Sequence, residues 1–319
     1  MAGGFEKTEW IWRDGEFVRW DDATIHVMSH VAHYGSSIFE GIRCYSTPNG
    51  TSIFRLEDHM KRFLDSGKVY RMEFDYSVEE LSLVVEETVR RNNLPEGYIR
   101  PLGMRGYGPP GLNPSASPLH LFVICWPWGA YLGEDGIQSG IDVGVSSWQR
   151  MEPNTFPALS KAGGNYLNAG LMKMEAIANG YAEAIALGPG GLVSEGPGQN
   201  IFLVRDGMLI TPAVDGTLLP GITRDSIITV AKDIGITVSE QPVPREMLYT
   251  CDEVFFTGTA AELTPIRSVD RIPVGNGNVG PVTRTLQNRF MGILRGQIPD
   301  AYGWCRIVRT GGAVPVGRA

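Results

Sequence analysis

The sequence predicts a mixed fold of two domains, a smaller α+β domain at the N-terminus and a larger α/β domain at the C-terminus. A chain of 319 residues is long enough for two domains that each have a sizeable core. Strand and helix patterns alternate more regularly in the second half, which favours the α/β class there. A short aromatic connector at 128–136 separates the predicted domains, which span residues 1–127 and 137–319.

Composition and charge indicate a soluble protein that binds small molecules. Hydrophobic residues make up 43% of the chain, charged residues 20%, and the net charge is −7, which argues against nucleic acid as the main partner. No apolar run is long enough to span a bilayer, and the N-terminus lacks the features of a signal peptide. The four cysteines are scattered without a CxxC pair, so we expect neither a disulfide framework nor a zinc site. A cytoplasmic location is therefore expected.

The first half carries clear element signals. Apolar runs on both sides of Asp14-Gly15 predict a β-hairpin. A helix that begins near Leu56 places Arg62 beside its core face, where Arg62 either forms a surface ion pair or binds an anion. A capping box, Ser77 to Glu80, opens a second helix. The Gly- and Pro-rich stretch 106–117 must be a loop, and a buried strand follows it.

Three histidines could form a metal site. His26, His30 and His33 follow one another at i, i+4 and i+7, which on a helix would place three imidazoles on one face. No carboxylate lies between them, and no Cys or His cluster elsewhere completes a ligand set. A structural role is therefore favoured, and we expect no bound metal.

A tyrosine and an arginine share one face of a predicted strand. Tyr98 and Arg100 are two residues apart in the stretch 98–102. A hydroxyl and a guanidinium that point the same way could grip a carboxylate, since arginine matches a carboxylate bidentately. The alternative is an ordinary cross-strand pair on a solvated face.

The second half contains two loops suited to anions. Thr223 is predicted to cap a helix whose free backbone N–H groups make a natural phosphate site. The stretch 256–262 ends a strand in small residues that include Thr259, and it is a second candidate. The expected strands are 141–148, 183–187, 200–204, 208–210, 237–240 and 253–257, and the expected helices are 165–179, 223–234 and 281–295.

Two charged residues in glycine-rich turns could carry chemistry. Lys161 precedes Gly163-Gly164 and a helix, and it is either a surface lysine or an amine that forms a Schiff base with an aldehyde cofactor. Glu195 lies in a tight glycine turn between strands. It is either a solvated carboxylate or one that pairs with a heterocyclic ring nitrogen and keeps that nitrogen protonated.

Taken together, these stretches resemble the class IV aminotransferases, the fold type IV family of pyridoxal-phosphate (PLP) enzymes, and most of all their branched-chain members. The resemblance covers nearly the whole chain, and the matching motifs occur in register. They are His33-Tyr34-Gly35, Phe39-Glu40-Gly41-Ile42-Arg43, Tyr98-Ile99-Arg100-Pro101, Trp128-Gly129-Ala130-Tyr131, Lys161-Ala162-Gly163-Gly164-Asn165-Tyr166, Ser194-Glu195-Gly196, Pro220-Gly221-Ile222-Thr223-Arg224 and Gly258-Thr259-Ala260-Ala261-Glu262.

The resemblance implies that PLP lies between the two domains and assigns residues to it. Lys161 would form the Schiff base and move the proton between substrate and cofactor. Glu195 would pair with the pyridine nitrogen, and Tyr166 would hydrogen-bond the phenolic oxygen. The phosphate would be held by Arg62, Ile222, Thr223 and Thr259.

The resemblance also implies the substrates, namely branched-chain L-amino acids with 2-oxoglutarate as the amino acceptor. Arg100 would receive the distal carboxylate of glutamate, and Tyr98 with the Thr259-Ala260 turn would take the α-carboxylate. The apolar walls would come from Tyr34, Phe39, Trp128, Tyr131 and Tyr166.

Several alternatives stay open at this point. D-amino acid aminotransferases, aminodeoxychorismate lyases and (R)-selective amine transaminases share the lysine and glutamate motifs. The Gly106 to Gly111 loop could shift the preference toward bulkier substrates. A small-molecule binding protein without turnover is the alternative that is not an enzyme. The family's habit of completing its pockets with a neighbouring subunit predicts a homodimer or a larger homo-oligomer.

Overall fold

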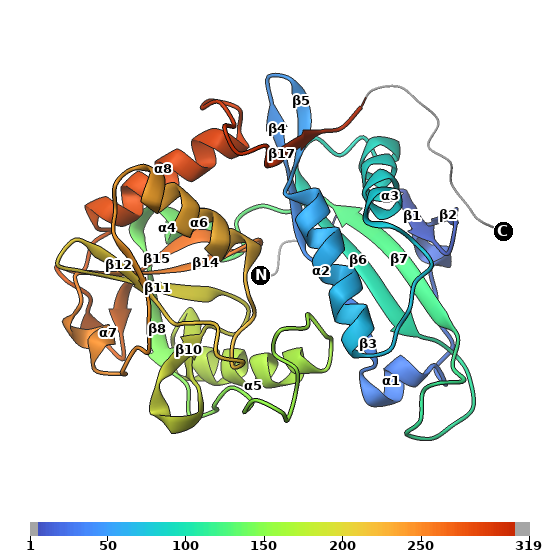
Figure 1. The fold of residues 1–319 in the computed structure, drawn as a ribbon, viewed down its shortest axis with the longest axis horizontal. Helices are drawn as coiled ribbons and strands as arrows, with labels where there is room; N and C mark the ends of the chain where they lie inside the picture. Colours follow the sequence, from blue (N-terminus) through green and yellow to red (C-terminus); the bar gives the residue numbers. More distant parts are fainter. Residues whose placement is uncertain (1–5, 310–319) are drawn as a thin grey trace. The chain divides into compact units, whose positions relative to one another are not determined.

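The computed structural model describes residues 6–309 and divides into two compact units, each built on one large sheet (Figure 1). The first unit comprises residues 6–128, 160–164 and 293–309, and the second comprises residues 129–159 and 165–292. The sequence-based division places 160–164 and the C-terminal segment in the second domain. Both segments belong to the first unit because they pair with strands that are distant in the chain, and local sequence patterns do not reveal such pairing.

The first unit contains an eight-stranded antiparallel sheet. The strands follow the order β17-β5-β4-β6-β7-β1-β2, and β3 also pairs with β6. Their bounds are β1 (Trp10–Arg13), β2 (Glu16–Arg19), β3 (Ser37–Phe39), β4 (Ile42–Thr47), β5 (Gly50–Phe54), β6 (Gly97–Arg105), β7 (Leu119–Trp126) and β17 (Cys305–Ile307).

Two long helices cover a face of this sheet. Helices α2 (Leu56–Val69) and α3 (Val78–Arg91) pack on each other and on the sheet, as Figure 1 shows. The Ser77–Glu80 capping box at the start of α3 is present as predicted. The short elements η1 (Trp20–Asp22) and α1 (His30–Tyr34) complete the unit. The core between sheet and helices includes Trp12, Ile38, Phe63 and Val85, all at most 1% exposed.

The second unit contains a nine-stranded mixed sheet. The order is β10-β9-β8-β15-β14-β11-β12-β13, with β16 beside β15; β8 runs parallel to β9 and β15, and β12 runs parallel to β13. The bounds are β8 (Ile141–Val145), β9 (Glu183–Leu187), β10 (Val193–Glu195), β11 (Asn200–Arg205), β12 (Met208–Thr211), β13 (Val238–Glu240), β14 (Glu253–Gly258), β15 (Glu262–Val269) and β16 (Ile272–Pro273).

Of the helices between these strands, those near 165–179, 223–234 and 281–295 form where the sequence predicts them, and the short ones at 134–139, 189–191 and 247–250 are additional. The bounds are α4 (Glu134–Ser139), α5 (Asn165–Ala178), η2 (Pro189–Gly191), α6 (Ile222–Asp233), α7 (Met247–Thr250) and α8 (Pro281–Leu294). Strand β15 was missed because its sequence, with a proline in the middle, lacks the alternation of a half-buried strand. It is a buried interior strand of the sheet, and such strands do not alternate.

The structure rules out one local alternative and corrects one local expectation. Helix α1 begins only at His30, so His26 lies outside it and the three imidazoles do not share a helical face. Helix α6 is capped by Gly221 rather than Thr223, and Thr223 is the second residue of its first turn. The side chain of Asn200 fills the space that a Cβ at Gly221 would need, which explains a glycine there. Among residues 6–309, no helix is long and apolar enough to cross a membrane.

Candidate active site

Lys161 lies in a short segment that extends the first sheet beside β3. The carbonyl of Lys161 accepts the Phe39 N–H (2.9 Å), and the Gly163 N–H donates to the Ser37 carbonyl (2.8 Å). The Lys161 N–H donates to Oγ of Ser66 on α2 (3.0 Å). Both sides of the lysine backbone are therefore fixed, which gives its side chain a defined starting point.

The glycines after Lys161 serve this pairing. A Cβ added at Gly163 would lie 2.2 Å from Oγ of Ser37, a distance that no side chain tolerates. Gly35 brings its own backbone close to Gly164, since a Cβ there would lie 3.5 Å from the Gly164 Cα. The Ser37 side chain therefore explains the glycine at position 163.

The Lys161 amine has an environment that favours its neutral form. The residue is half-buried, and Nζ lies 4.8 Å from the centre of the Phe39 ring. Burial lowers the pKa of the amine to about 8, although the Glu40 carboxylate opposes the change. A surface lysine would keep a pKa near 10.4, so the interpretation of Lys161 as a surface residue is wrong.

A buried ionic group lies in the same unit. The Glu40 carboxylate, between β3 and β4, accepts from Nε and Nη2 of Arg62 (2.6 and 2.8 Å) and from Nδ1 of His59 (2.7 Å). Glu40 and His59 are fully buried, and the Arg62 side chain is 13% exposed. Burial would raise the pKa of Glu40, but the charge of Arg62 and the contact with His59 hold it well below its ordinary value.

Tyr98 and Arg100 lie together on β6, as their spacing predicts. Nη2 of Arg100 donates to the Tyr98 hydroxyl (3.3 Å), and the guanidinium lies 4.5 Å from the centre of the Phe39 ring. Nε of Arg100 is buried without a partner among the described residues. Gly41 makes room for the tyrosine, since a Cβ there would lie 1.9 Å from the Tyr98 hydroxyl. The Phe39 ring thus contacts both the Lys161 amine and the Arg100 guanidinium.

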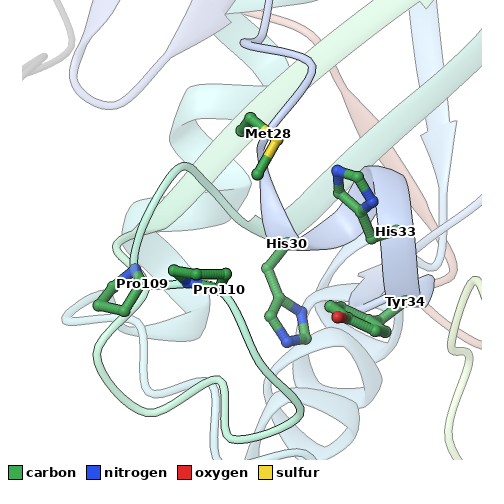
Figure 2. A pocket seen from close by; sticks show the side chains of 6 residues that line it. All are labelled: Met28, His30, His33, Tyr34, Pro109 and Pro110. Atoms are coloured by element: carbon green, nitrogen blue, oxygen red, sulfur yellow. The ribbon is translucent and has the colours of Figure 1, made fainter.

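The remaining aromatic candidates lie in different places. Trp128 packs edge-on against Tyr98, with ring centres 4.8 Å apart. Tyr131, in the second unit, lies near Lys173, whose Nζ is 5.5 Å from its ring. Tyr34 lines a hollow of about 50 Å³ with Met28, His30, His33, Pro109 and Pro110 (Figure 2). The loop 106–117 therefore borders Tyr34 within the first unit.

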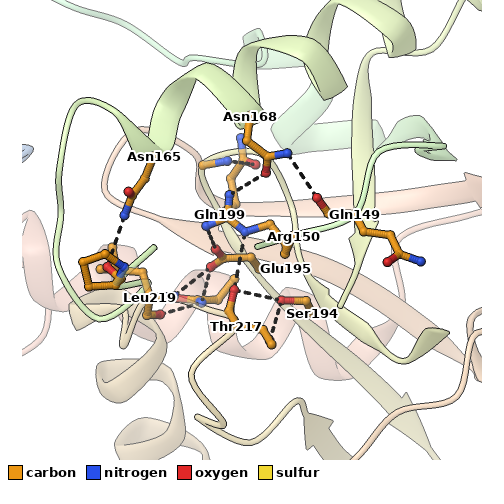
Figure 3. Close-up of polar contacts among 12 residues, drawn as sticks. Gln149, Arg150, Asn165, Asn168, Ser194, Glu195, Gln199, Thr217 and Leu219 are labelled. Atoms are coloured by element: carbon orange, nitrogen blue, oxygen red, sulfur yellow. Dashed lines mark hydrogen bonds and ion pairs between the residues drawn. The ribbon is translucent and has the colours of Figure 1, made fainter. Parts of the chain in front are cut away.

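Glu195 is the centre of a polar network in the second unit (Figure 3). It is the last residue of β10 and is 5% exposed, so the interpretation as a solvated turn carboxylate is wrong. Nη2 of Arg150 lies 2.8 Å from its Oε1, and both side chains are 6% exposed. A buried carboxylate keeps its charge only when it is paired and hydrogen-bonded, and Arg150 supplies that pairing.

The same network ties Glu195 to the start of α6. The Asn200 side chain donates to Glu195 Oε2 (3.2 Å) and to the Leu219 carbonyl (2.9 Å). The Leu219 N–H also donates to Glu195 (3.2 Å). Behind it, Ser194 and Thr217 join their hydroxyls at 3.0 Å. The glutamate and the first turn of α6, with Ile222 and Thr223, are therefore held in one arrangement.

Two further candidates belong to this arrangement. Tyr166, on the first turn of α5, lies beside the turn after Glu195, since a Cβ at Gly198 would be 4.0 Å from its ring. Thr259 and Ala260 form the tight loop between β14 and β15, next to Gly258, where a Cβ would lie 3.4 Å from the Gly198 carbonyl. The hydroxyl of Thr257, at the end of β14, is buried without a partner among the described residues.

The comparison with known families now decides the identity of the fold. The family model "Amino-transferase class IV" matches residues 37–269, which contain most of the groups described above. The chain belongs to the class IV aminotransferases. The curated branched-chain-amino-acid aminotransferase of Escherichia coli K12 is 51% identical over 300 residues, covering 94% of this chain and 97% of the relative.

Solved structures of class IV aminotransferases agree. A crystal structure of the Escherichia coli branched-chain amino acid aminotransferase superposes with a TM-score of 0.93 at 50% identity, covering 95% of this chain and all of that one. The branched-chain amino acid aminotransferase of Thermobaculum terrenum, solved in its PLP form, gives a TM-score of 0.88 at 33% identity, covering 94% of this chain and 98% of that one.

The cofactor of class IV aminotransferases is PLP, and the residues present fit it. An aldehyde requires a neutral amine, and the lowered pKa of Lys161 provides one. A pyridine nitrogen that must stay protonated requires an ionised carboxylate, and Glu195 is buried in a pair with Arg150. A phosphate requires cations and backbone N–H groups, which Arg62 and the first turn of α6 offer within their own units.

The sequence analysis missed four residues that hold these groups in place. Arg150 and Asn200 support Glu195, and Glu40 and His59 support Arg62. Arg150 lies in an irregular loop that gives no local signal. Glu40 offered a signal, because a charged residue that breaks a strand next to a glycine often has a buried partner.

Proposed function

We propose that this chain is a PLP-dependent transaminase that transfers the amino group of leucine, isoleucine or valine to 2-oxoglutarate, and the reverse. The observation that carries the proposal is the Phe39 ring, which lies against both the Lys161 amine and the Arg100 guanidinium. A base and a carboxylate-binding cation on one apolar ring suit a substrate that is either aliphatic or acidic.

Lys161, Glu195 and Tyr166 are proposed to act on the cofactor ring. PLP supplies an aldehyde carbon that exchanges amines and a ring that withdraws electrons from the substrate Cα. Lys161, with its neutral amine, would take the proton from Cα and return it. Glu195 would hold the proton on the ring nitrogen, and Tyr166 would donate its hydroxyl to the phenolic oxygen.

The phosphate is proposed to be held by residues of three stretches. Arg62 would supply the charge, the backbone of Ile222 and Thr223 would supply N–H groups at the start of α6, and Thr259 would supply a hydroxyl. The buried first turn of α6 supports this proposal, because Ile222 is 8% and Thr223 is 4% exposed.

The substrate is proposed to contact Arg100 through its distal carboxylate, when it has one. Tyr98 and the Thr259-Ala260 turn would take the α-carboxylate. The apolar side chains of leucine, isoleucine and valine would pack on aromatic walls, which we assign to Tyr34, Phe39, Trp128, Tyr131 and Tyr166.

Leucine added without a keto acid tests the activity directly. The purified holoenzyme should absorb in the visible region, and leucine should remove that absorbance within one half-reaction. The Lys161→Ala variant should show no such change and no steady-state turnover. If that variant kept wild-type turnover, the assignment of Lys161 would be wrong. Faster bleaching by D-alanine or by an (R)-amine would favour the related transaminases instead.

The Arg100→Leu variant tests the two-sided pocket. Without the guanidinium, glutamate and 2-oxoglutarate should lose at least about tenfold in kcat/KM, because a charge-assisted hydrogen bond contributes about 1.5 to 3 kcal/mol. Leucine and isoleucine should still load the cofactor in half-reactions followed by absorbance. Equal losses for acidic and aliphatic substrates would contradict the proposed role of Arg100.

A homodimer is the proposed assembly. The segment 27–34, which includes α1, and the loop 106–112 expose large apolar side chains, with Val27 73%, Met28 42%, Tyr34 49%, Tyr107 59% and Leu112 82% exposed. We call this the apolar patch, and exposed apolar surface of this kind suits association with a second copy. A cytoplasmic location is proposed because all four cysteines are free, and three of them are buried.

A further inference from the structure

Glu40 is a buried charge to which the proposed roles assign nothing. It follows Phe39 at the break between β3 and β4 and is 0% exposed. Its backbone N–H donates to the Pro101 carbonyl on β6 (2.9 Å), which fixes its main chain. Burying an ionised carboxylate costs free energy unless hydrogen bonds and an opposite charge compensate it. The groups that bind Glu40 therefore indicate its role.

The partners of Glu40 come from one face of helix α2. His59 and Arg62 are three residues apart, and both reach the carboxylate. Arg62 binds through Nε and Nη2 to the two carboxylate oxygens, which is the bidentate geometry of a guanidinium. This contact holds the Nε–Nη2 edge of the guanidinium and so fixes the plane of the whole group.

His59 completes the arrangement without adding charge. Nδ1 lies 2.7 Å from Glu40, so it carries the proton, while Nε2 is buried without a partner among the described residues. Burial lowers the pKa of His59, against the opposing effect of Glu40, so the imidazole stays neutral. Arg62 is therefore the cation paired with Glu40, and the charge of Glu40 also acts on the Lys161 amine.

We propose that Glu40 is a positioning residue that orients the Arg62 guanidinium for the phosphate group of PLP, and that His59 fixes Glu40 from the other side. This inference rests on the proposed role of Arg62 as a phosphate ligand. An arginine side chain loses much rotamer freedom when it binds an anion, and a partner that holds it beforehand removes that cost from binding.

The position of Glu40 also links the phosphate arginine to the lysine. Phe39, its neighbour, donates its N–H to the Lys161 carbonyl, and Ser66, one helical turn beyond Arg62, accepts the Lys161 N–H. The corner at Glu40 and helix α2 therefore place both Arg62 and Lys161. A cofactor with an aldehyde and a phosphate at a fixed separation requires such coordination.

The test compares PLP with pyridoxal, which has the same aldehyde and ring but lacks the phosphate. The full-length enzyme is freed of cofactor and reloaded in phosphate-free buffer, and both affinities are measured from the absorbance of the bound cofactor. The readout is the ratio of the two dissociation constants. A variant that alters the reaction of Lys161 with the aldehyde changes both dissociation constants by the same factor, so this effect cancels in the ratio.

Glu40→Gln should reduce the preference for PLP over pyridoxal at least about tenfold, because one charge-assisted contact corresponds to a tenfold or larger factor. His59→Asn should reduce it less, since the bidentate contact with Arg62 remains. Asp58→Asn is the matched control. Asp58 lies on α2, the helix that carries Arg62, but its carboxylate pairs with Arg55, so the variant should leave the preference for PLP unchanged.

The outcomes separate the inference from the role of Arg62 on which it rests. An unchanged preference in Arg62→Gln would refute the phosphate role itself. A lowered preference in Arg62→Gln with an unchanged one in Glu40→Gln would refute only the positioning role. The double variant, Glu40→Gln with Arg62→Gln, should lose no more of the preference for PLP than Arg62→Gln alone. A further tenfold loss of that preference would show that Glu40 acts independently of Arg62. If Glu40→Gln does not fold, Glu40→Asp, which withdraws the charge by one methylene, serves in the same comparison.

Discussion

At the scale of single residues, burial and paired charge determine the chemistry of this site. Lys161 loses hydration beside the Phe39 ring, and its neutral form becomes accessible near physiological pH. Glu195 keeps its charge in a buried place because Arg150 is paired with it. One group is thus shifted toward the neutral state and the other is held ionised, as an amine nucleophile and a ring counter-ion require.

The pKa of Lys161 gives a pH dependence of defined sign. A lysine whose pKa is lowered to about 8 gains nucleophilicity up to pH 8 and none beyond. In the cofactor-free enzyme, acetylation of Lys161 by a neutral reagent should rise about tenfold per pH unit below pH 8 and then level off. Mass spectrometry of the Lys161 peptide after brief labelling measures this profile. A free lysine compound, with a pKa of about 10.4, is the comparison. A profile for Lys161 that still rises at pH 10 would contradict the environment described.

At the scale of elements, the segment 160–164 is an added edge on β3 rather than a loop. The hydrogen bond from Gly163 to Ser37 and the one from Phe39 to Lys161 set the register. The bridge between Ile38 and Ala162 lies between these two hydrogen bonds. Because side chains alternate along a strand, a slip by one residue would turn Lys161 to the opposite face. The position of the amine is therefore decided by backbone pairing.

Gly163→Ala should disturb this pairing and lower activity. The new methyl group would lie 2.2 Å from the Ser37 hydroxyl, and relief requires the Ser37 side chain to rotate or the lysine segment to move. A displacement of about 1 Å at a reacting group can cost about 100-fold in rate, so we expect kcat to fall at least about tenfold. Steady-state transamination and the absorbance of the bound cofactor measure the effect.

Two variants interpret that result. Ser37→Ala combined with Gly163→Ala removes the hydroxyl that clashes and should restore part of the activity. Gly170→Ala, on α5, meets no atom within 4 Å and should leave activity unchanged. A Gly163→Ala enzyme with full activity would show that the register tolerates the added methyl group.

At the scale of the whole molecule, the apolar patch on the segment 27–34 and the loop 106–112 is a feature that a single chain leaves unexplained. The loop is held against the segment before α1 by the stacking of Tyr107 on His26, and against α1 by the contact of His30 Nε2 with the Gly111 carbonyl (3.2 Å). An ordered surface that exposes several large apolar side chains is typical of an interface.

A charge placed in this patch should weaken the proposed dimer. Leu112→Asp introduces a carboxylate that association would have to bury, which costs several kcal/mol. Sedimentation velocity should show a dimer in the wild type and a shift toward monomer in the variant at the same concentration. Val214→Asp, at an apolar residue 42% exposed in the second unit, is the control and should not shift the distribution. A monomeric wild type would refute the proposed assembly.

The sequence by itself determined many of the longer elements and most of the candidate residues. The spacing of apolar residues, together with turn and capping residues, predicted the Asp14-Gly15 hairpin and the Ser77 cap. The two-residue spacing on a strand predicted that Tyr98 lies beside Arg100. These signals are local, since they depend on residues within a few positions of each other. The motifs around Lys161 and Glu195 predicted the family, which the comparisons confirm.

The tertiary structure decided which of those residues act together. Only long-range pairing could place residue 161 beside residue 39, or a residue of α2 against Glu40, because neither pairing has a periodic signature. Only burial could show that Glu195 is enclosed with Arg150, since a carboxylate in a glycine turn has the same sequence whether it is solvated or not. The sequence therefore indicated the lysine, and the surrounding fold lowers the pKa of its amine.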